Sequence, residues 1–221
     1  FEFNDIAKMA IKLVKEYQDV NLEISGRGTG DMRFPSIELM WVDGTNTVDF
    51  VYESHEIIEG KNKLNTLPSS YGTNDQVKTL KVVLKEKVYN VNLELYYSVF
   101  YETNVITRSS VLVNNTDSLV KIKRLMSAQL DIPGSGYTFT TFRGDWANEM
   151  NKHDTKVSGS TVINTSRTGF SSSHANPFVM LFSEGSSEFY GEGYEKYGLF
   201  GSNGKTIMAH CVWCSEEERV L

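Results

Sequence analysis

The clearest pattern in this chain of 221 residues is the alternation of apolar and other side chains over residues 79–100. From Val91 to Val99 every second side chain belongs to one apolar set, and Asn92, Glu94 and Ser98 fall between its members. A period of two places successive side chains on opposite faces of a strand. The pattern therefore predicts two long antiparallel strands, at residues 79–86 and 88–100.

The same period continues on both sides of this pair. Residues 36–42 and 47–52 read as strands joined by an Asp43-Gly44 turn, which predicts a local hairpin. Further strands are predicted at residues 105–113, 119–130, 137–142, 156–165 and 178–182. Polar, glycine-containing or proline-containing loops separate them, including residues 61–71 and the Arg143-Gly144-Asp145-Trp146 interruption.

Residues 5–18 carry a different period. Their apolar side chains recur at helical spacing: Ile6, Met9, Ala10, Leu13, Val14 and Tyr17. Asn4 or Asp5 can cap the helix. We predict an amphipathic helix whose apolar stripe covers a sheet edge or packs on the core.

With no internal repeat and no linker, these elements predict an all-β chain with one short N-terminal helix. The predicted organisation is a single antiparallel β-sandwich domain over residues 1–221, with a helical segment at 5–18, the sandwich core at 19–193 and a tail at 194–221.

Composition and charge narrow the function. A hydrophobic content of 40% supports a full core, and the net charge of −6 with scattered basic residues disfavours a nucleic-acid partner. No apolar run approaches the length of a membrane span, and the first residues do not resemble a secretory signal. We expect a soluble cytoplasmic protein without a membrane partner.

The two cysteines, Cys211 and Cys214, form a Cys-Val-Trp-Cys sequence after His210. Such a pair can be redox-active or half of a zinc site, but no second ligand pair is visible. Two reduced thiols are the prediction, with no metal and no cofactor.

The glycine-rich stretch around residues 26–33 is the first candidate site. Its glycines alternate with Arg27 and Thr29, and Asp31 and Arg33 then flank Met32. A phosphate loop is disfavoured because Pro35 and a β-rich run follow where a helix is needed. The loop bends freely and projects charge of both signs.

A second group of candidates lies in the later half. Asp145 and Trp146 combine a charge with an indole face that can stack on a sugar ring, although Trp146 equally suits a buried anchor. His174 lies in a polar loop that continues to Asn176 and either hydrogen-bonds a sugar or forms a turn. His55, at a predicted strand start, is interpreted as structural.

Several of these motifs occur together in one known family. The segments RGTGDMR (27–33), YYSVF (96–100), GDWA (144–147) and SSHANPF (172–178) resemble, in this order, the N-terminal domain of bacterial family 36 α-galactosidases. The resemblance covers roughly residues 17–193. It implies a large antiparallel β-supersandwich of the galactose-mutarotase-like kind.

The resemblance also implies a division of labour. In that family a separate (β/α)8 barrel with two catalytic aspartates removes α-linked galactose, and the Lys-Trp/Tyr-Asp motif of the nucleophile does not occur in this sequence. The chain is therefore expected to be inactive alone, with no catalytic residue. Its expected role is a non-catalytic domain or fragment that contributes to oligomer assembly and to the substrate cleft.

The partners implied are α-galactoside sugars through the full enzyme, the catalytic barrel and neighbouring subunits, with a homo-oligomer as the expected assembly. The candidate substrate or interface residues are Arg27, Asp31, Arg33, Asp145, Trp146, His174 and Asn176. Two alternatives stay open: a free-standing carbohydrate-binding sandwich, and a mutarotase-like protein with a His and a Glu on one concave sheet face.

The chain departs from the family pattern at both ends. The family has further strands where this chain has the predicted helix at 5–18, and the tail at 194–221 lacks the expected continuation. The chain is thus truncated or divergent at its ends, and a truncated sandwich would expose unpaired edge strands.

Overall fold

The computed structural model describes residues 22–64, 69–103, 105–130, 135–165, 172–174, 176–183, 206–210 and 219–220. All regular secondary structure in these residues is strand, which confirms the predicted all-β class. The strands are β1 (Ile37–Met40), β2 (Phe50–Glu59), β3 (Val77–Glu86), β4 (Val91–Phe100), β5 (Val105–Asn114), β6 (Lys121–Leu125), β7 (Tyr137–Asp145), β8 (Asn148–Lys156), β9 (Phe178–Ser183), β10 (Thr206–His210) and β11 (Arg219–Val220). The helix predicted at residues 5–18 lies outside the described residues.

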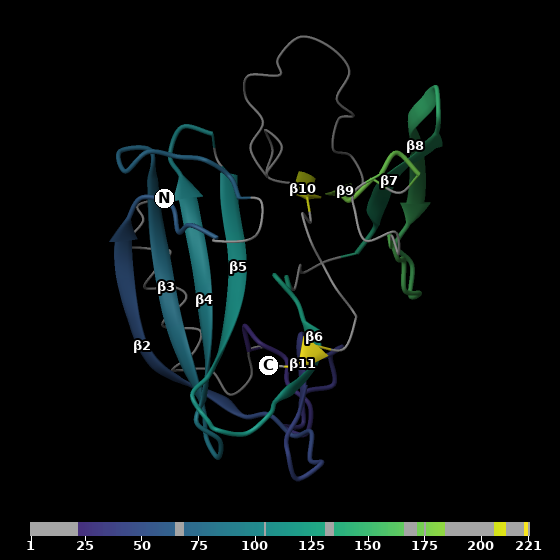
Figure 1. Cartoon of the computed structure of the whole chain (residues 1–221). Helices are drawn as coiled ribbons and strands as arrows, with labels where there is room; N and C mark the ends of the chain where they lie inside the picture. The colour runs from purple at the N-terminus through teal and green to yellow at the C-terminus, as the bar shows by residue number, and fades with distance from the viewer. Residues whose placement is uncertain are drawn as a thin grey trace. The chain divides into compact units, whose positions relative to one another are not determined.

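The strands form three sheets in two compact units (Figure 1). The first unit holds a four-stranded sheet in the order β2-β3-β4-β5 and a three-stranded sheet in the order β1-β6-β11. The second unit holds a four-stranded sheet in the order β10-β9-β7-β8. The pairs β1–β6, β6–β11, β9–β10, β2–β3, β3–β4, β7–β8 and β7–β9 are all antiparallel, which agrees with the predicted strand arrangement.

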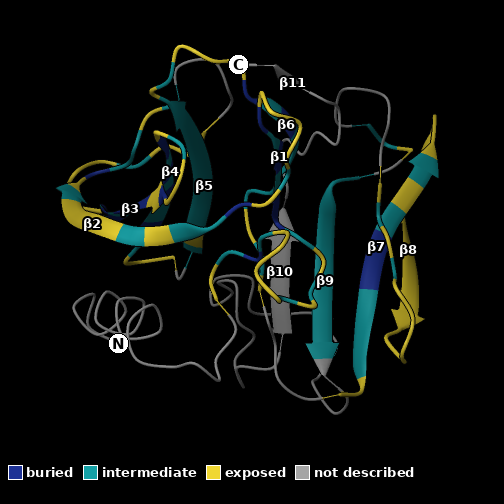
Figure 2. Cartoon of the chain, turned by 90° about the horizontal axis from the view of Figure 1, so that it is seen from below, coloured by how far each residue is buried: buried dark blue, intermediate teal, exposed yellow. Residues whose placement is uncertain are grey.

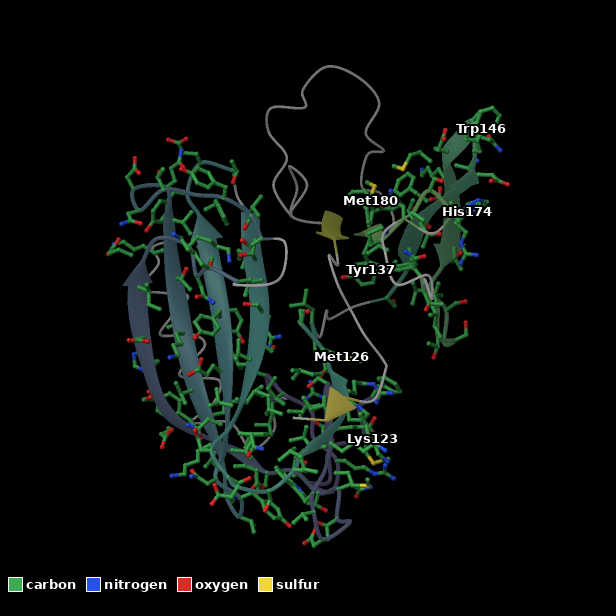
Figure 3. The ribbon with its side chains drawn as sticks, in the orientation of Figure 1. Lys123, Met126, Tyr137, Trp146, His174 and Met180 are labelled. Carbon is green, nitrogen blue, oxygen red and sulfur yellow. The ribbon has the colours of Figure 1, made fainter. Side chains whose placement is uncertain are left out.

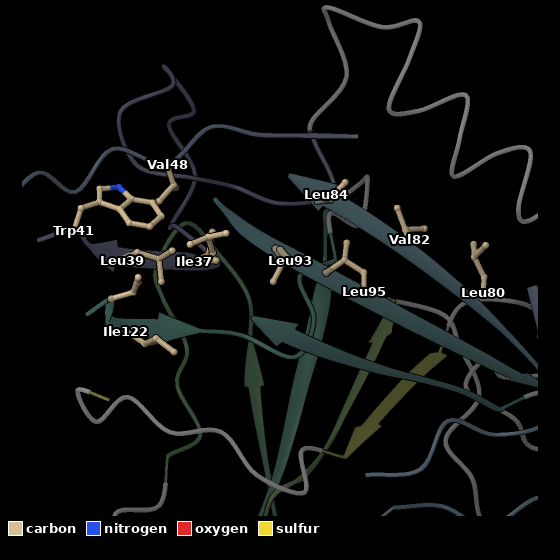
Figure 4. Packing of buried hydrophobic residues seen from close by; sticks show 12 residues of the cluster. Ile37, Leu39, Trp41, Val48, Leu80, Val82, Leu84, Leu93, Leu95 and Ile122 are labelled. Atoms are coloured by element: carbon tan, nitrogen blue, oxygen red, sulfur yellow. The ribbon is translucent and has the colours of Figure 1, made fainter. Parts of the chain in front are cut away.

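The core of the first unit forms between the inner faces of its two sheets (Figure 4). In the four-stranded sheet, Leu84 pairs with Leu93, and the next row on the same face pairs Val82 with Leu95. Leu39 contributes from β1 and, like Leu93, is fully buried. Each such side chain stabilises the fold by about 1.5–3 kcal/mol relative to exposure. The alternation in the sequence therefore reflects the burial of one face of each strand in this core.

The hairpin predicted from residues 36–42 and 47–52 is wrong. A turn does form at Asp43-Gly44, where the Gly44 N–H donates to the Trp41 carbonyl at 2.9 Å. However, β1 pairs with β6 and β2 pairs with β3, so the flanking strands enter different sheets. Between them Val48 is 1% exposed and the Trp41 indole donates to the Thr47 carbonyl at 2.8 Å. Burial of these side chains outweighs the local pairing that the turn favours.

Other observed strand boundaries also differ from the predicted ones. The strands predicted at 79–86, 88–100, 105–113 and 178–182 correspond to β3, β4, β5 and β9, whereas β6 is much shorter than the predicted 119–130. His55 lies in the middle of β2 and not at its start.

The strand predicted at 156–165 is also wrong, because residues 157–165 form none and the strand precedes them as β8. All nine β8 residues are exposed at the edge of their sheet (Figure 2). An edge strand with no buried face leaves no apolar alternation in its sequence.

No helix among the described residues is long and apolar enough to cross a membrane.

Candidate functional site

The candidate residues fall into two groups, one in each compact unit. Arg27, Asp31 and Arg33 lie in the loop of residues 26–35 before β1, which belongs to the first unit. The others, Asp145, Trp146, His174 and Asn176, gather around the turn between β7 and β8 in the second unit.

Asp31 and Arg33 bind each other. The Arg33 guanidinium donates from Nη2 to Asp31 Oδ2 at 2.6 Å and from Nε to Oδ1 at 3.0 Å, and the Arg33 backbone N–H donates to Oδ1 at 3.0 Å. Arg33 Nη2 also donates to the Leu22 carbonyl at 2.7 Å. The hydrogen bond from the Arg33 side chain lowers the pKa of Asp31 below its usual value. This fork fixes the shape of the loop from within.

The glycines let the loop lie close to the segment before β2. A Cβ on Gly26 would stand 2.8 Å from Val48 Cγ2, and one on Gly28 would stand 2.6 Å from Thr47 Oγ1. Gly28 also has a φ of 88°, which glycine adopts without strain. The glycines therefore serve packing and turning in this loop.

The third charged residue of the loop points to the β1–β6 pair. Arg27 Nη1 lies 3.6 Å from Glu38 Oε1, and Arg124 Nη1 donates to Glu38 Oε2 at 2.5 Å. The Arg124 guanidinium also lies 4.0 Å from the ring centroid of Phe34. Much of the loop charge is thus paired within the unit.

The loop also exposes two large apolar side chains. Met32 is 97% exposed and Phe34 is 61% exposed. The sequence reasoning missed both residues as candidates. Their signal was present in the sequence, as two large apolar side chains in a loop otherwise rich in glycine and charge.

In the second unit, the β7–β8 hairpin turns at Trp146 and Ala147. The register shifts between Arg143 and Asp145, and a Cβ on Gly144 would stand 2.4 Å from the Asn148 carbonyl oxygen across the hairpin. Ala147 and Met150 have φ values of 58° and 59°, a left-handed conformation that non-glycine residues seldom adopt. The turn therefore holds strained backbone, which in proteins clusters at functional sites.

Two carboxylates cap this turn. Asp145 Oδ1 accepts from the Trp146 N–H at 2.7 Å, and Glu149 Oε1 accepts from the Ala147 N–H at 3.1 Å. Trp146 itself is 89% exposed, so it is not a buried anchor. Figure 3 shows Trp146 at the tip of the hairpin and His174 beside it. His174 Nε2 lies 3.7 Å from Asp145 Oδ1, which links the loop of residues 172–174 to the turn when the imidazole is protonated.

Asn176 acts as a structural connector. Its backbone N–H donates to the Phe142 carbonyl at 3.1 Å, and its Oδ1 accepts from the Phe178 N–H at 2.9 Å. Its Nδ2 donates to Met150 Sδ at 3.2 Å. Asn176 thus connects the loop before β9 to the hairpin, and both polar atoms of its side chain hydrogen-bond to protein groups.

A shallow, open hollow of about 340 Å³ lies between the hairpin and this loop. Its lining residues are Glu149, Met150, Ser172, Ser173, Asn176 and Pro177. The Ser172 Oγ atom is buried there without a hydrogen-bond partner. The sequence indicated the polar loop that supplies Ser172, Ser173, Asn176 and Pro177, but not Glu149 or Met150, because nothing local brings β8 beside that loop.

No group of three or more metal-ligating side chains occurs among the described residues. The Cys211 and Cys214 pair lies outside them.

Comparison with known proteins gives a consistent result. The family model described as "Glycosyl hydrolase family 36 N-terminal domain" matches residues 4–196. "Probable alpha-galactosidase G" of Aspergillus terreus is 35% identical over 175 residues, which cover 79% of this chain and 24% of the relative. "Alpha-galactosidase AgaA" of Geobacillus stearothermophilus is 31% identical over 182 residues, which cover 82% and 25%.

The crystal structure of that Geobacillus enzyme superposes with a TM-score of 0.71 at 29% identity, covering 74% of this chain and 23% of its own. A variant of the same enzyme in complex with raffinose gives a TM-score of 0.67 at 28% identity, again covering 74% and 23%. The chain spans about a quarter of the length of the curated relatives it matches.

Proposed function

We propose that this chain, which belongs to the glycosyl hydrolase family 36 N-terminal domain family, serves as a non-catalytic domain of an α-galactosidase acting on α-linked galactosides. The observation that carries the proposal is the match of residues 4–196 to this family together with 35% identity to a protein named as an α-galactosidase. The raffinose complex of the Geobacillus enzyme supports an α-galactoside as the substrate class.

A non-catalytic role suits the carboxylates of this chain. Hydrolysis with retention needs two carboxyl groups roughly 5–5.5 Å apart on either side of the glycosidic carbon. At the hairpin, Asp145 and Glu149 instead cap backbone N–H groups of a turn. Bond cleavage is therefore assigned to a part of the enzyme other than this domain.

A role in assembly is supported by the loop of residues 26–35. The loop exposes Met32 and Phe34 on a frame fixed by the Asp31–Arg33 fork. Exposed apolar groups on a rigid frame are the usual anchors of protein interfaces. We assign this loop to contacts with the catalytic barrel or a neighbouring subunit in a homo-oligomer.

The proposal is tested by comparing the full-length gene product with the 221-residue chain. The full-length protein is expected to release p-nitrophenol from p-nitrophenyl α-galactopyranoside, and the chain alone is expected to show no turnover. Hydrolysis by the chain alone, or a full-length protein inactive on this substrate, raffinose and melibiose alike, would contradict the proposal.

A second function is favoured by one observation, the 89% exposed Trp146 at the hairpin tip. A carbohydrate-binding sandwich that works without an enzyme would use such an indole as its platform. Under this alternative the full-length protein binds a sugar but hydrolyses no α-galactoside, so the same assay separates the two functions.

A further inference from the structure

We propose that the exposed edge of β8 pairs with the same edge of a second copy of this chain, so that the two β-sheets join across a two-fold axis at His153. In the proposed antiparallel ladder, Lys152 of each copy lies opposite the partner's Asp154. The contact goes beyond the proposed function, because it involves neither the loop of residues 26–35 nor any step of hydrolysis.

The edge of β8 is open for another strand. β8 stands at one end of the β10-β9-β7-β8 sheet, and all nine of its residues are exposed (Figure 2). Its sequence contains no proline, and its register against β7 shifts only near the turn, between Arg143 and Asp145. The unpaired backbone groups of such an edge are a template for pairing with another chain. Residues 151–156 therefore offer a regular edge.

Two hydrogen bonds of β7 show which backbone groups of β8 point outward. The Val157 N–H donates to the Tyr137 carbonyl at 2.8 Å, so residue 157 directs its N–H toward β7. The Phe142 carbonyl, which is opposite Lys152, instead accepts from the Asn176 N–H at 3.1 Å, in the segment before β9. Backbone groups alternate in direction along an antiparallel strand. The residues whose backbone groups point away from β7 are therefore Lys152, Asp154 and Lys156.

Charge selects one register for the pairing of two copies. Hydrogen bonds between the copies form only where outward-pointing residues oppose each other. An axis at His153 meets this condition and places Lys152 opposite the partner's Asp154 on both sides of the axis. An axis at Lys152 would set two lysines face to face, and an axis at Asp154 would set two aspartates face to face. Opposite charges stabilise a cross-strand pair and like charges destabilise it, so the register centred on His153 is favoured.

The side chains of Lys152 and Asp154 are already held on one face of the sheet. Lys152 Nζ lies 3.0 Å from Asp154 Oδ2 and 5.7 Å from the ring centroid of Phe182, and the Thr140 hydroxyl donates to Asp154 Oδ1. In the ladder, each ammonium group would stand between its own carboxylate and that of the partner. The two copies thus form a ring of alternating charges, and such a network contributes more than an isolated surface pair.

The exposed edge strand of the first unit lacks this complementarity. β2 stands at one end of the β2-β3-β4-β5 sheet, and its acidic residues Glu53, Glu56 and Glu59 are accompanied by no lysine or arginine in the same strand. Two copies of β2 would therefore bring carboxylates together without a cation from either edge. The alternating charges of β8, by contrast, match a second β8.

The test is sedimentation velocity of the 221-residue chain at concentrations from about 1 µM to about 1 mM, where a weak dimer becomes populated. Reversible dimerisation is expected. Asp154→Lys places cations opposite each other at both pairs and should weaken the dimer at least about fivefold. Adding Lys152→Asp to that variant restores opposite charges at both pairs and should restore the association.

The matched control is Glu56→Lys, which makes the same change of charge on the exposed strand β2 and should leave the dimer unchanged. Circular dichroism verifies that each variant is folded. Hydrogen exchange of the unaltered chain gives a readout that needs no variant. The outward amides of Lys152 and Asp154 should become protected as the concentration rises, whereas the amide of His153, which faces β7, should change little.

Four results would overturn the inference: a chain that stays monomeric at about 1 mM, a dimer that Asp154→Lys does not weaken, a double variant that does not regain association, or exchange at Lys152 and Asp154 that is independent of concentration. The hydrolysis assay is separate from all four. An active full-length enzyme with a monomeric chain would leave the proposed function standing and remove the β8 contact. A β8-dependent dimer of a protein without hydrolysis would do the reverse.

Discussion

Gly144 is the residue on which the geometry of the hairpin turn most directly depends. A Cβ at this position would stand 2.4 Å from the Asn148 carbonyl oxygen and 2.7 Å from Glu149 Cα. Both are backbone atoms of the partner strand, so no side-chain rotation can relieve the contact. Cβ atoms in proteins essentially never come closer than 3.0 Å to another heavy atom, so the two strands must separate by about 0.6 Å to reach that distance. They must separate by about 1 Å to reach ordinary van der Waals contact.

We therefore expect Gly144→Ala to destabilise the second unit by about 1–3 kcal/mol, the usual cost of overpacking. The same displacement moves Glu149 relative to Ser172 and Ser173, which line the hollow with it. The environment of the Trp146 indole at the hairpin tip is expected to change with it.

The matched control is Gly159→Ala. Gly159 has a φ of 71°, so alanine is strained there, but its Cβ would meet nothing within 4 Å. The control should therefore lower stability by about 1 kcal/mol without moving the hairpin. Urea denaturation measures stability, and the NMR shift of the Trp146 indole N–H reports the position of the turn. The reasoning is refuted if Gly144→Ala leaves stability and the indole shift unchanged, or if Gly159→Ala moves the shift equally.

Three further substitutions test the first unit by urea denaturation. Asp31→Ala removes the charge-assisted hydrogen bonds from Arg33 and should lower the free energy of unfolding by about 1.5–3 kcal/mol at pH 7. Because folding lowers the pKa of Asp31, this contribution is present above the unfolded pKa of about 3.9 and disappears as the pH falls through the folded pKa. A stability difference that stays undiminished at pH 2 would contradict the assignment. Leu93→Ala should lower the free energy of unfolding by about 2–5 kcal/mol, whereas the exposed control Val88→Ala should lower it by less than about 0.5 kcal/mol. Equal losses of stability would contradict the core described above. The Glu86 carboxylate accepts hydrogen bonds from backbone N–H groups of the β3–β4 turn, including that of Val88 at 2.7 Å. Glu86→Ala removes this acceptor and should lower the free energy of unfolding by about 3 kcal/mol, with faster hydrogen exchange at those amides. Unchanged exchange rates would contradict this role of Glu86.

The fold class could be predicted because it depends on a local property. Alternation over residues 79–100 reports a strand with one buried face, and β3 and β4 indeed place Leu84 and Leu93 together in the core. Where that condition fails, the prediction fails too. The sequence of β8 has no buried face, so nothing in its pattern distinguished it from a loop.

The site was only partly predictable for the same reason. The sequence identified Trp146 and His174 as residues whose chemistry suits sugar binding. It left their environment undecided, because an indole suits a buried anchor as well as a sugar platform. The 89% exposure of Trp146 excludes the buried anchor. Glu149 could not be recognised as a neighbour of Ser172, because that relation depends on the packing of β7 against both β8 and β9.

The sequence by itself determined the strand periodicity, the acidic charge and the ordered motifs from RGTGDMR to SSHANPF that mark the family. The tertiary structure alone decided which strands pair. It sends β1 to β6 although the Asp43-Gly44 turn favours a hairpin, and it brings Ser172 beside Glu149. The physical reason is that periodicity and turn chemistry act over a few residues, whereas sheet partners and hollows are set by burial of side chains distant in sequence.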